Sequence, residues 1–160
     1  MRKLLIPLLA LVMVPAATAG FTVTLNTTSP QTFTAITLSG IDQTKTLPLS
    51  ITVTNTGGTN GTGWSVTAAA GAPTSAAGTL SPLQVTAVSA AACTGSCVQP
   101  LNNVAVPVSL TAGGVKIYNA AAGTGTGSVV LTATLQMTYD AKALPGTYTA
   151  SLTVAGTTSP

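Results

Sequence analysis

The clearest pattern in the chain is the alternation of apolar residues with hydroxyl-bearing or amide residues, which is the period of a half-buried β-strand. It is longest over residues 129–139, where Val, Leu, Ala, Met and Tyr occupy every second position. Residues 47–53 and 148–154 repeat the pattern, each beside a cluster of Gly, Pro or Asn that predicts a turn. These three segments are the strongest strand predictions.

Weaker alternation extends the same architecture along the chain. Further strands are predicted over residues 21–26, 33–39, 64–68, 83–89, 104–108 and 115–118. No segment carries a helical period of useful length. Short strands separated by turn-forming residues predict an all-β, single-domain antiparallel β-sandwich. Its apolar faces lie between two sheets, and its Thr and Ser face water.

The first nineteen residues follow a different pattern. Arg2 and Lys3 precede an apolar run over residues 4–14, and Ala17-Thr18-Ala19 has the small-x-small form of a signal peptidase site. This layout predicts a secretory signal peptide at residues 1–19, cleaved to leave residues 20–160. A membrane anchor or a buried helix is the alternative, but the apolar run is shorter than the roughly 20 residues that span a bilayer. We expect a secreted, extracellular protein with no membrane span after cleavage.

Composition then removes most catalytic chemistry from consideration. The chain has no His and no Glu, and its acids are Asp42 and Asp140. A His-dependent triad cannot be built, and only a Ser–Lys dyad stays formally open. We therefore expect no enzymatic activity, no catalytic residues and no cofactor. After cleavage three lysines face two aspartates, a formal net charge of +1, so no basic patch remains for nucleic acid.

Cys93 and Cys97 bracket a three-residue loop, Thr94-Gly95-Ser96. In an exported protein, two cysteines this close most simply form a local disulfide. A zinc site is the rival interpretation, but structural zinc usually takes four nitrogen or sulfur ligands. With two cysteines and no His, we predict the disulfide and no metal site. Asp140 alone is a weak calcium site, because calcium takes about six to eight oxygen ligands. Turn capping is the better interpretation for both Asp42 and Asp140.

Three segments, taken in order, resemble a known family. They are Gly61-Thr62-Gly63-Trp64-Ser65-Val66-Thr67, the Val115–Ile117 strand with its Gly/Ala-rich turn to residue 127, and residues 145–153. Together behind a signal peptide they resemble the WxL family of bacterial cell-surface proteins. The resemblance implies that residues 20–160 form a WxL-like β-sandwich domain. It also implies noncovalent binding to the cell wall through peptidoglycan or another wall polymer.

The chain departs from the family pattern at both of its Trp motifs. The first reads Trp64-Ser65-Val66, with Val in place of Leu, and the second, at residues 152–156, contains no Trp. If the resemblance holds, Trp64 and Val66 are the candidate ligand-binding residues, because an indole face stacks on a sugar ring. The competing interpretation is that Trp64 is a core residue, as are Tyr139 and Tyr148 on the apolar faces of their strands.

Two functions follow from these patterns. The first is a cell-wall-associated surface protein that binds peptidoglycan. The alternative is a structural or adhesin subunit of the cell surface, which assembles through β-strand edges or binds another surface protein. The near-neutral charge predicted for the cleaved chain favours the alternative, because it would not resist association.

Overall fold

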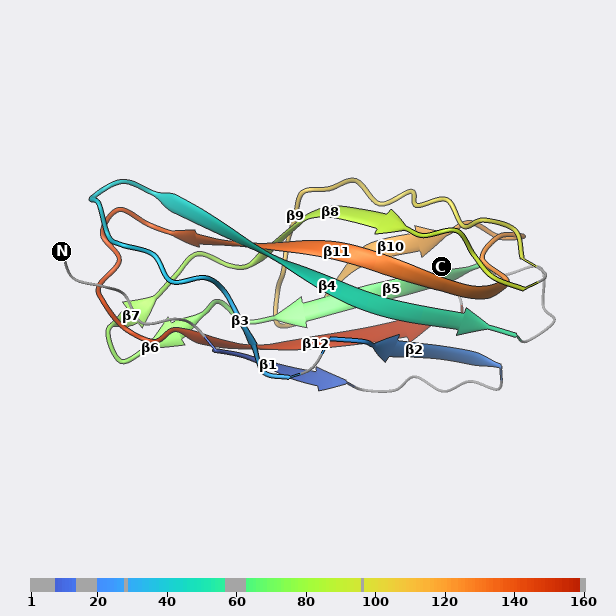
Figure 1. Ribbon diagram of the computed structural model, residues 1–160, viewed down its shortest axis with the longest axis horizontal. Helices are drawn as coiled ribbons and strands as arrows, with labels where there is room; N and C mark the ends of the chain where they lie inside the picture. The colour runs from blue at the N-terminus through green and yellow to red at the C-terminus, as the bar shows by residue number, and fades with distance from the viewer. Residues whose placement is uncertain (1–7, 14–19, 28, 57–62, 96, 159–160) are drawn as a thin grey trace.

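The fold is an all-β sandwich, as the alternation predicts. The computed structural model describes residues 8–13, 20–27, 29–56, 63–95 and 97–158, and these contain no helix. Two sheets pack face to face in an elongated molecule (Figure 1). In the described part of the chain, no helix is long and apolar enough to cross a membrane. The predicted turn at residues 55–61 falls largely outside the described residues, as does the predicted cleavage point.

The first sheet is antiparallel and is built around the two longest strands. Its order is β2 (Phe21–Leu25), β4 (Gln43–Asn55), β11 (Gly127–Tyr139), β8 (Gln84–Ala90) and β9 (Val108–Ser109). β4 and β11 pair without interruption from Gly127–Asn55 to Tyr139–Gln43. Two of the three strongest strand predictions, residues 47–53 and 129–139, thus form the centre of this sheet.

The second sheet contains the Trp-bearing strand. Its order is β10 (Val115–Ala120), β5 (Trp64–Ala70), β12 (Thr149–Thr157), β1 (Leu8–Met13) and β3 (Gln31–Thr32). A short hairpin of β6 (Thr74–Ser75) and β7 (Gly78–Thr79) pairs with β12. All pairings are antiparallel except that of β1 with β12, which is parallel. β1 lies within the predicted signal peptide, and this gives the sheet a strand that the sequence pattern did not indicate.

The core lies between the two sheets and follows the predicted faces. Along β11 every second residue is buried: Val129, Leu131, Ala133, Leu135, Met137 and Tyr139. In and beside β12, Tyr148, Leu152 and Val154 are buried in the same way. Full burial of each large apolar side chain contributes about 1.5–3 kcal/mol relative to exposure. The two faces inferred from the alternation are therefore confirmed for these strands.

A β-bulge corrects the predicted face of residues 83–89. On β8, Ala87 lies opposite Thr134 while Val85 lies opposite Leu135, so Thr86 is an extra residue. One inserted residue reverses the orientation of all that follow. Ala87 is consequently exposed, although it was expected to share the apolar face of Val85, and Val88 packs against the core instead.

Two predicted strands are largely wrong. Residues 33–39 form no continuous strand; Phe33 and Ile36, three positions apart, both enter the core. Of residues 104–108 only Val108 is in a strand, the two-residue β9. Val104 donates its backbone N–H to the Asn102 side chain at 3.1 Å, and Pro107 has no N–H to donate. A side chain that takes the backbone donor competes with a strand ladder.

Candidate binding surface over Trp64

Trp64 is the first residue of β5, and it is completely enclosed. Its exposed fraction is 0%. The indole stacks on Tyr118, with ring centroids 5.2 Å apart and planes at 17°, and tilts against Phe21 at 6.4 Å. Its Nε1–H donates a hydrogen bond to the Gly125 carbonyl at 2.9 Å. The polar edge of the ring is thus satisfied while its faces pack, which is how a buried Trp is normally stabilised.

Glycines explain how the chain closes over this ring. Gly125 has φ +71°, and a Cβ placed there would collide with the indole nitrogen of Trp64. Gly63 has φ +65°, and a Cβ there would collide with the carbonyl oxygen of Ala120. Both the left-handed conformation and the close approach require glycine. Gly125 therefore allows its turn to lie against the indole, and Gly63 allows the start of β5 to lie against the backbone of residues 120–122.

The three segments that carry the family resemblance lie together in one sheet. Trp64 pairs with Ala120 across the β5–β10 ladder. On its other side β5 pairs with β12, from Leu152–Ala70 to Thr157–Ser65. The segments thus form neighbouring strands, although the chain separates them widely.

Burial places both predicted ligand-binding residues in the core. Trp64 and Val66 each have an exposed fraction of 0%. Neither side chain therefore has exposed surface with which to make the predicted contact with a wall polymer. Trp64 instead contacts Gly125, whose N–H is bonded to the backbone of Val98.

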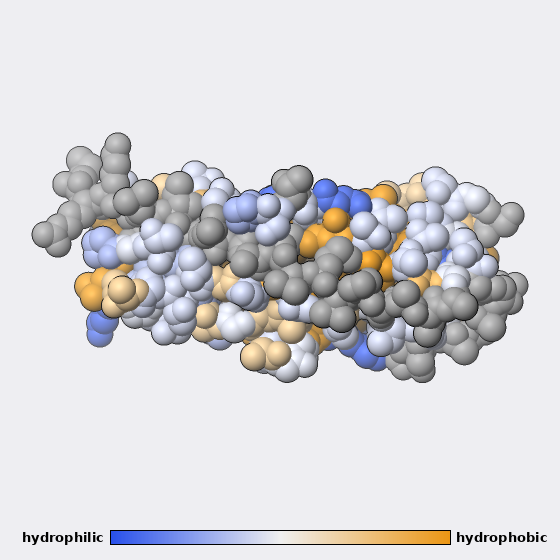
Figure 2. Space-filling view, turned by 90° about the horizontal axis from the view of Figure 1, so that it is seen from below, coloured by the Kyte–Doolittle hydropathy of each residue, from blue (hydrophilic) through white to orange (hydrophobic). Residues whose placement is uncertain are grey.

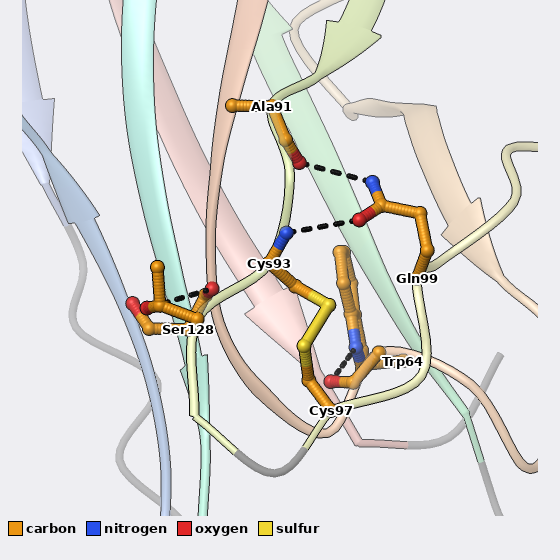
Figure 3. The surroundings of a disulfide bond; sticks show 8 residues. Trp64, Ala91, Cys93, Cys97, Gln99 and Ser128 are labelled. Atoms are coloured by element: carbon orange, nitrogen blue, oxygen red, sulfur yellow. Dashed lines mark hydrogen bonds between the residues drawn. A yellow bond between two sulfur atoms is a disulfide. The ribbon is translucent and has the colours of Figure 1, made fainter.

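The predicted disulfide joins Cys93 to Cys97. Gln99 holds the loop on one side: its Nε2 donates to the Ala91 carbonyl, and its Oε1 accepts the Cys93 N–H, both at 2.9 Å (Figure 3). On the other side Thr94 and Ser128 exchange backbone hydrogen bonds of 2.9 and 3.2 Å. The loop is therefore fixed to β11 and to its own flanks, besides being closed covalently.

The segment after the disulfide lies over the aromatic pair. The Gly125 N–H donates to the Val98 carbonyl at 2.8 Å, and the Tyr118 hydroxyl donates to the Pro100 carbonyl at 3.0 Å. Both acceptors are backbone carbonyls of the segment, and its apolar side chains Val98 and Leu101 face solvent. Val98 is 55% exposed and Leu101 is 71% exposed. Large contiguous apolar patches mark interaction sites, whereas single exposed apolar residues are common on protein surfaces.

The same segment also carries an exposed amide, Asn103. The Asn119 Nδ2 donates to the Asn103 Oδ1 at 2.9 Å. The Asn119 Oδ1 is buried and has no hydrogen-bond partner among the described residues. We define Val98, Leu101, Asn103 and Asn119 as the loop surface. The alternation did not reveal it; the local signals were two apolar residues and an Asn pair in a segment rich in turn formers.

The acidic residues take the turn roles expected of them. The Asp42 Oδ1 accepts the Ala141 N–H at 2.6 Å, and the Asp140 carboxylate accepts the Ser81 hydroxyl at 3.3 Å. Within the part of the chain that the structure describes, no group of three or more Cys or Asp residues comes together to hold a metal ion. The two carboxylates organise the loops near the start of β4 and the end of β11.

The buried tyrosines differ in how their hydroxyls are satisfied. Tyr139 and Tyr148 are 1% exposed, as their predicted core positions require. The Tyr148 hydroxyl donates to the Leu144 carbonyl at 2.9 Å. The Tyr139 hydroxyl has no partner among the described residues, and burial raises its pKa to about 12. Burial also raises the pKa of Tyr118. Tyr118 and Tyr139 therefore stay neutral near pH 7.

No family model matches this sequence, and no curated protein matches it. The WxL resemblance therefore remains a prediction carried by the three segments themselves.

Proposed function

We propose that this protein is an exported bacterial surface protein that associates noncovalently with the cell wall, binding peptidoglycan through the loop surface. The signal-peptide layout and the three WxL-like segments support this function. The Cys93–Cys97 disulfide is compatible with an extracellular location. Trp64 then acts as a support for the loop, and the ligand meets the residues that the loop exposes.

The observation that carries the proposal is the exposure of Val98 and Leu101 on a fixed loop that also carries Asn103, whose side chain accepts a hydrogen bond from Asn119. A sugar polymer offers apolar ring faces together with hydroxyl and amide groups. Recognition sites commonly combine apolar contact with a few placed polar groups. Because the loop is already ordered, binding costs little additional conformational entropy. An uncharged surface also predicts binding that changes little with salt concentration.

The experiment is a pull-down of residues 20–160 on purified Gram-positive peptidoglycan. The test variant is Val98→Ser with Leu101→Ser. The matched control is Ile41→Ser with Leu144→Ser, which removes two exposed apolar residues (68% and 57%). These residues lie just before β4 and just after β11, at the end of this strand pair that is away from the disulfide loop. We expect the parent and the control to sediment with the wall and the test variant to stay in solution.

Two results would overturn the proposal. A folded parent that stays in solution would remove wall binding altogether. Equal sedimentation of the parent and both variants would retain wall binding but exclude the loop surface as its site. Circular dichroism and the unfolding midpoint of each variant establish that folding is unchanged. Trp64→Ala serves as an additional variant, expected to lose binding together with order in residues 93–103.

A second candidate function is a surface subunit that binds a protein partner through a strand edge. The observation that favours it is the pairing of β12 with β1, a strand within the predicted signal peptide. Concentration-dependent assembly of residues 20–160 in light scattering, or capture of a partner strand, would support it. A strictly monomeric protein that takes up no strand would exclude it.

A further inference from the structure

The position of β1 in the second sheet indicates an acceptor site. Residues 8–13 pair in parallel with β12 over Leu8–Thr149 to Met13–Val154, and on the other side Leu8 and Leu9 pair with β3. β1 therefore lies between β12 and β3, with partners on both sides (Figure 1). Cleavage of the predicted signal peptide would remove β1 and leave a slot one strand wide. We call the space between Thr149–Val154 of β12 and Gln31–Thr32 of β3 the strand slot.

An empty strand slot would expose backbone donors and acceptors along β12. Unpaired backbone groups at a sheet edge readily accept another strand. β12 carries no charged residue and no proline in its sequence TASLTVAGT. Such residues are the usual means of preventing edge pairing. Nothing in β12 itself therefore opposes the addition of a strand.

The residues of β12 also define the chemistry that fits. Leu152 and Val154 are buried and Ala150 is half-buried, so one face of the slot belongs to the core. Thr149 and Ser151 on the other face are exposed. Figure 2, which views the molecule from below, shows hydrophobic residues gathered near the middle of this side. A fitting strand is extended and uncharged, with apolar residues at least at alternate positions, as the sequence LLALVM of β1 has.

We propose that in the exported chain the strand slot accepts an extended apolar strand from a partner protein, running parallel to β12. This is recognition by β-strand addition, in which main-chain hydrogen bonds give affinity and alternate side chains give specificity. The proposal rests on removal of the predicted signal peptide and does not depend on wall binding.

In a second copy, the strands among the described residues are already paired within its own sheets. The first strand after the predicted cleavage point, Phe21–Leu25, is already paired with β4 from Phe21–Asn55 to Leu25–Ile51. Its donation would break the first sheet of the donor. β12 itself forms one wall of the slot and pairs with β5 on its other side. The donor is therefore a segment that another protein leaves unpaired.

The segment that follows β3 in the same chain, residues 33–37, is kept out of the strand slot by its contacts with the core and with Gln43. Phe33 and Ile36 are anchored in the core, with exposed fractions of 1% and 5%. The Gln43 Nε2 donates to the Thr37 carbonyl at 2.8 Å. Moving this segment onto β12 would remove two large side chains from the core, which typically costs several kilocalories per mole. An incoming strand fills the slot without that loss.

The test uses residues 20–160 and a synthetic peptide of residues 2–14, which contains the whole of β1 and two positive charges for solubility. The control peptide carries Ala10→Pro and Leu11→Pro, which removes adjacent backbone N–H groups that point to opposite sides of the strand. We expect saturable binding of the first peptide by calorimetry and a rise of several degrees in Tm. Hydrogen exchange at residues 149–154 should slow when this peptide binds. The control peptide should produce none of these effects.

Failure of the β1 peptide to bind would overturn the proposal, and hydrogen exchange at residues 149–154 identifies the reason. If the peptide does not bind and residues 149–154 are already protected in a monomer, the chain closes the slot with its own segment. If they are protected only in a dimer, a second copy fills the slot. Equal binding of both peptides would indicate nonspecific apolar adsorption. Because no wall material is present, the result is independent of the pull-down on peptidoglycan.

Discussion

Replacing Tyr139 with Phe should stabilise this protein, although it deletes a polar group from the core. Tyr139 ends β11 and is 1% exposed, and its hydroxyl has no partner among the described residues. A buried hydroxyl without a hydrogen bond costs about 1–3 kcal/mol in lost hydration. Phe keeps the packed ring and removes that cost. We expect the free energy of unfolding of Tyr139→Phe to rise by about 1 kcal/mol at pH 7.

The same residue predicts the response to high pH. Burial raises the pKa of Tyr139 from 10.0 to about 12. Between these values the unfolded chain releases the proton while the folded chain retains it, so rising pH favours unfolding. This contribution to stability is fully present below pH 10 and is lost as pH rises to about 12. A shift of two pKa units corresponds to about 2.7 kcal/mol.

The assay is urea unfolding of residues 20–160 and of the variant at pH 7, 10, 11 and 12, followed by circular dichroism. Taking the difference between the two proteins removes the titration of the lysines. Tyr118→Phe is the matched control, because its hydroxyl donates to the Pro100 carbonyl at 3.0 Å and its loss should destabilise by about 1 kcal/mol. If Tyr139→Phe destabilises the protein as much as Tyr118→Phe does, the Tyr139 hydroxyl has a partner and the reasoning fails.

Three further predictions concern the closed turn, the disulfide and the bulge. Gly125→Ala should destabilise by about 3 kcal/mol more than Gly40→Ala, since both have positive φ but only Gly125 lies against the indole; thermal unfolding measures the difference. Cys93→Ala should cost about 2 kcal/mol, the loop entropy of a five-residue ring, and reductant should then have no further effect on Tm. Val88→Lys should destabilise by about 1–2 kcal/mol more than Ala87→Lys, because Val88 packs against the core and Ala87 is exposed. A lower urea midpoint for Ala87→Lys than for Val88→Lys would contradict the bulge.

The sequence by itself determined the architecture wherever a local period was strong. Along residues 129–139 the side chains alternate between two faces, because successive residues of a strand point in opposite directions. That period alone identifies which side chains from Val129 to Tyr139 share the face that is buried. Cys93 and Cys97 were equally decisive, because a four-residue separation leaves each cysteine a partner within reach. Local patterns of this kind need no knowledge of distant residues.

Tertiary structure decided the features that depend on segments distant in the chain. The bulge at Thr86 is visible only when β8 is aligned with β11. Phe33 and Ile36 enter the core from a segment that the sequence predicted as a strand but that forms none. Trp64 is buried because Gly125, 61 positions later, closes over its indole. Burial of a side chain depends on what packs against it, and a period of two identifies only the face on which it lies.

The loop surface and the strand slot show the same division. Val98 and Leu101 are ordinary apolar residues in the sequence, and their exposure arises because the backbone around them is bonded to Gly125 and Tyr118. The pairing of residues 8–13 with β12 joins the two ends of the chain. Such contacts arise from the geometry of the assembled sheets, since each requires two segments that no local pattern relates.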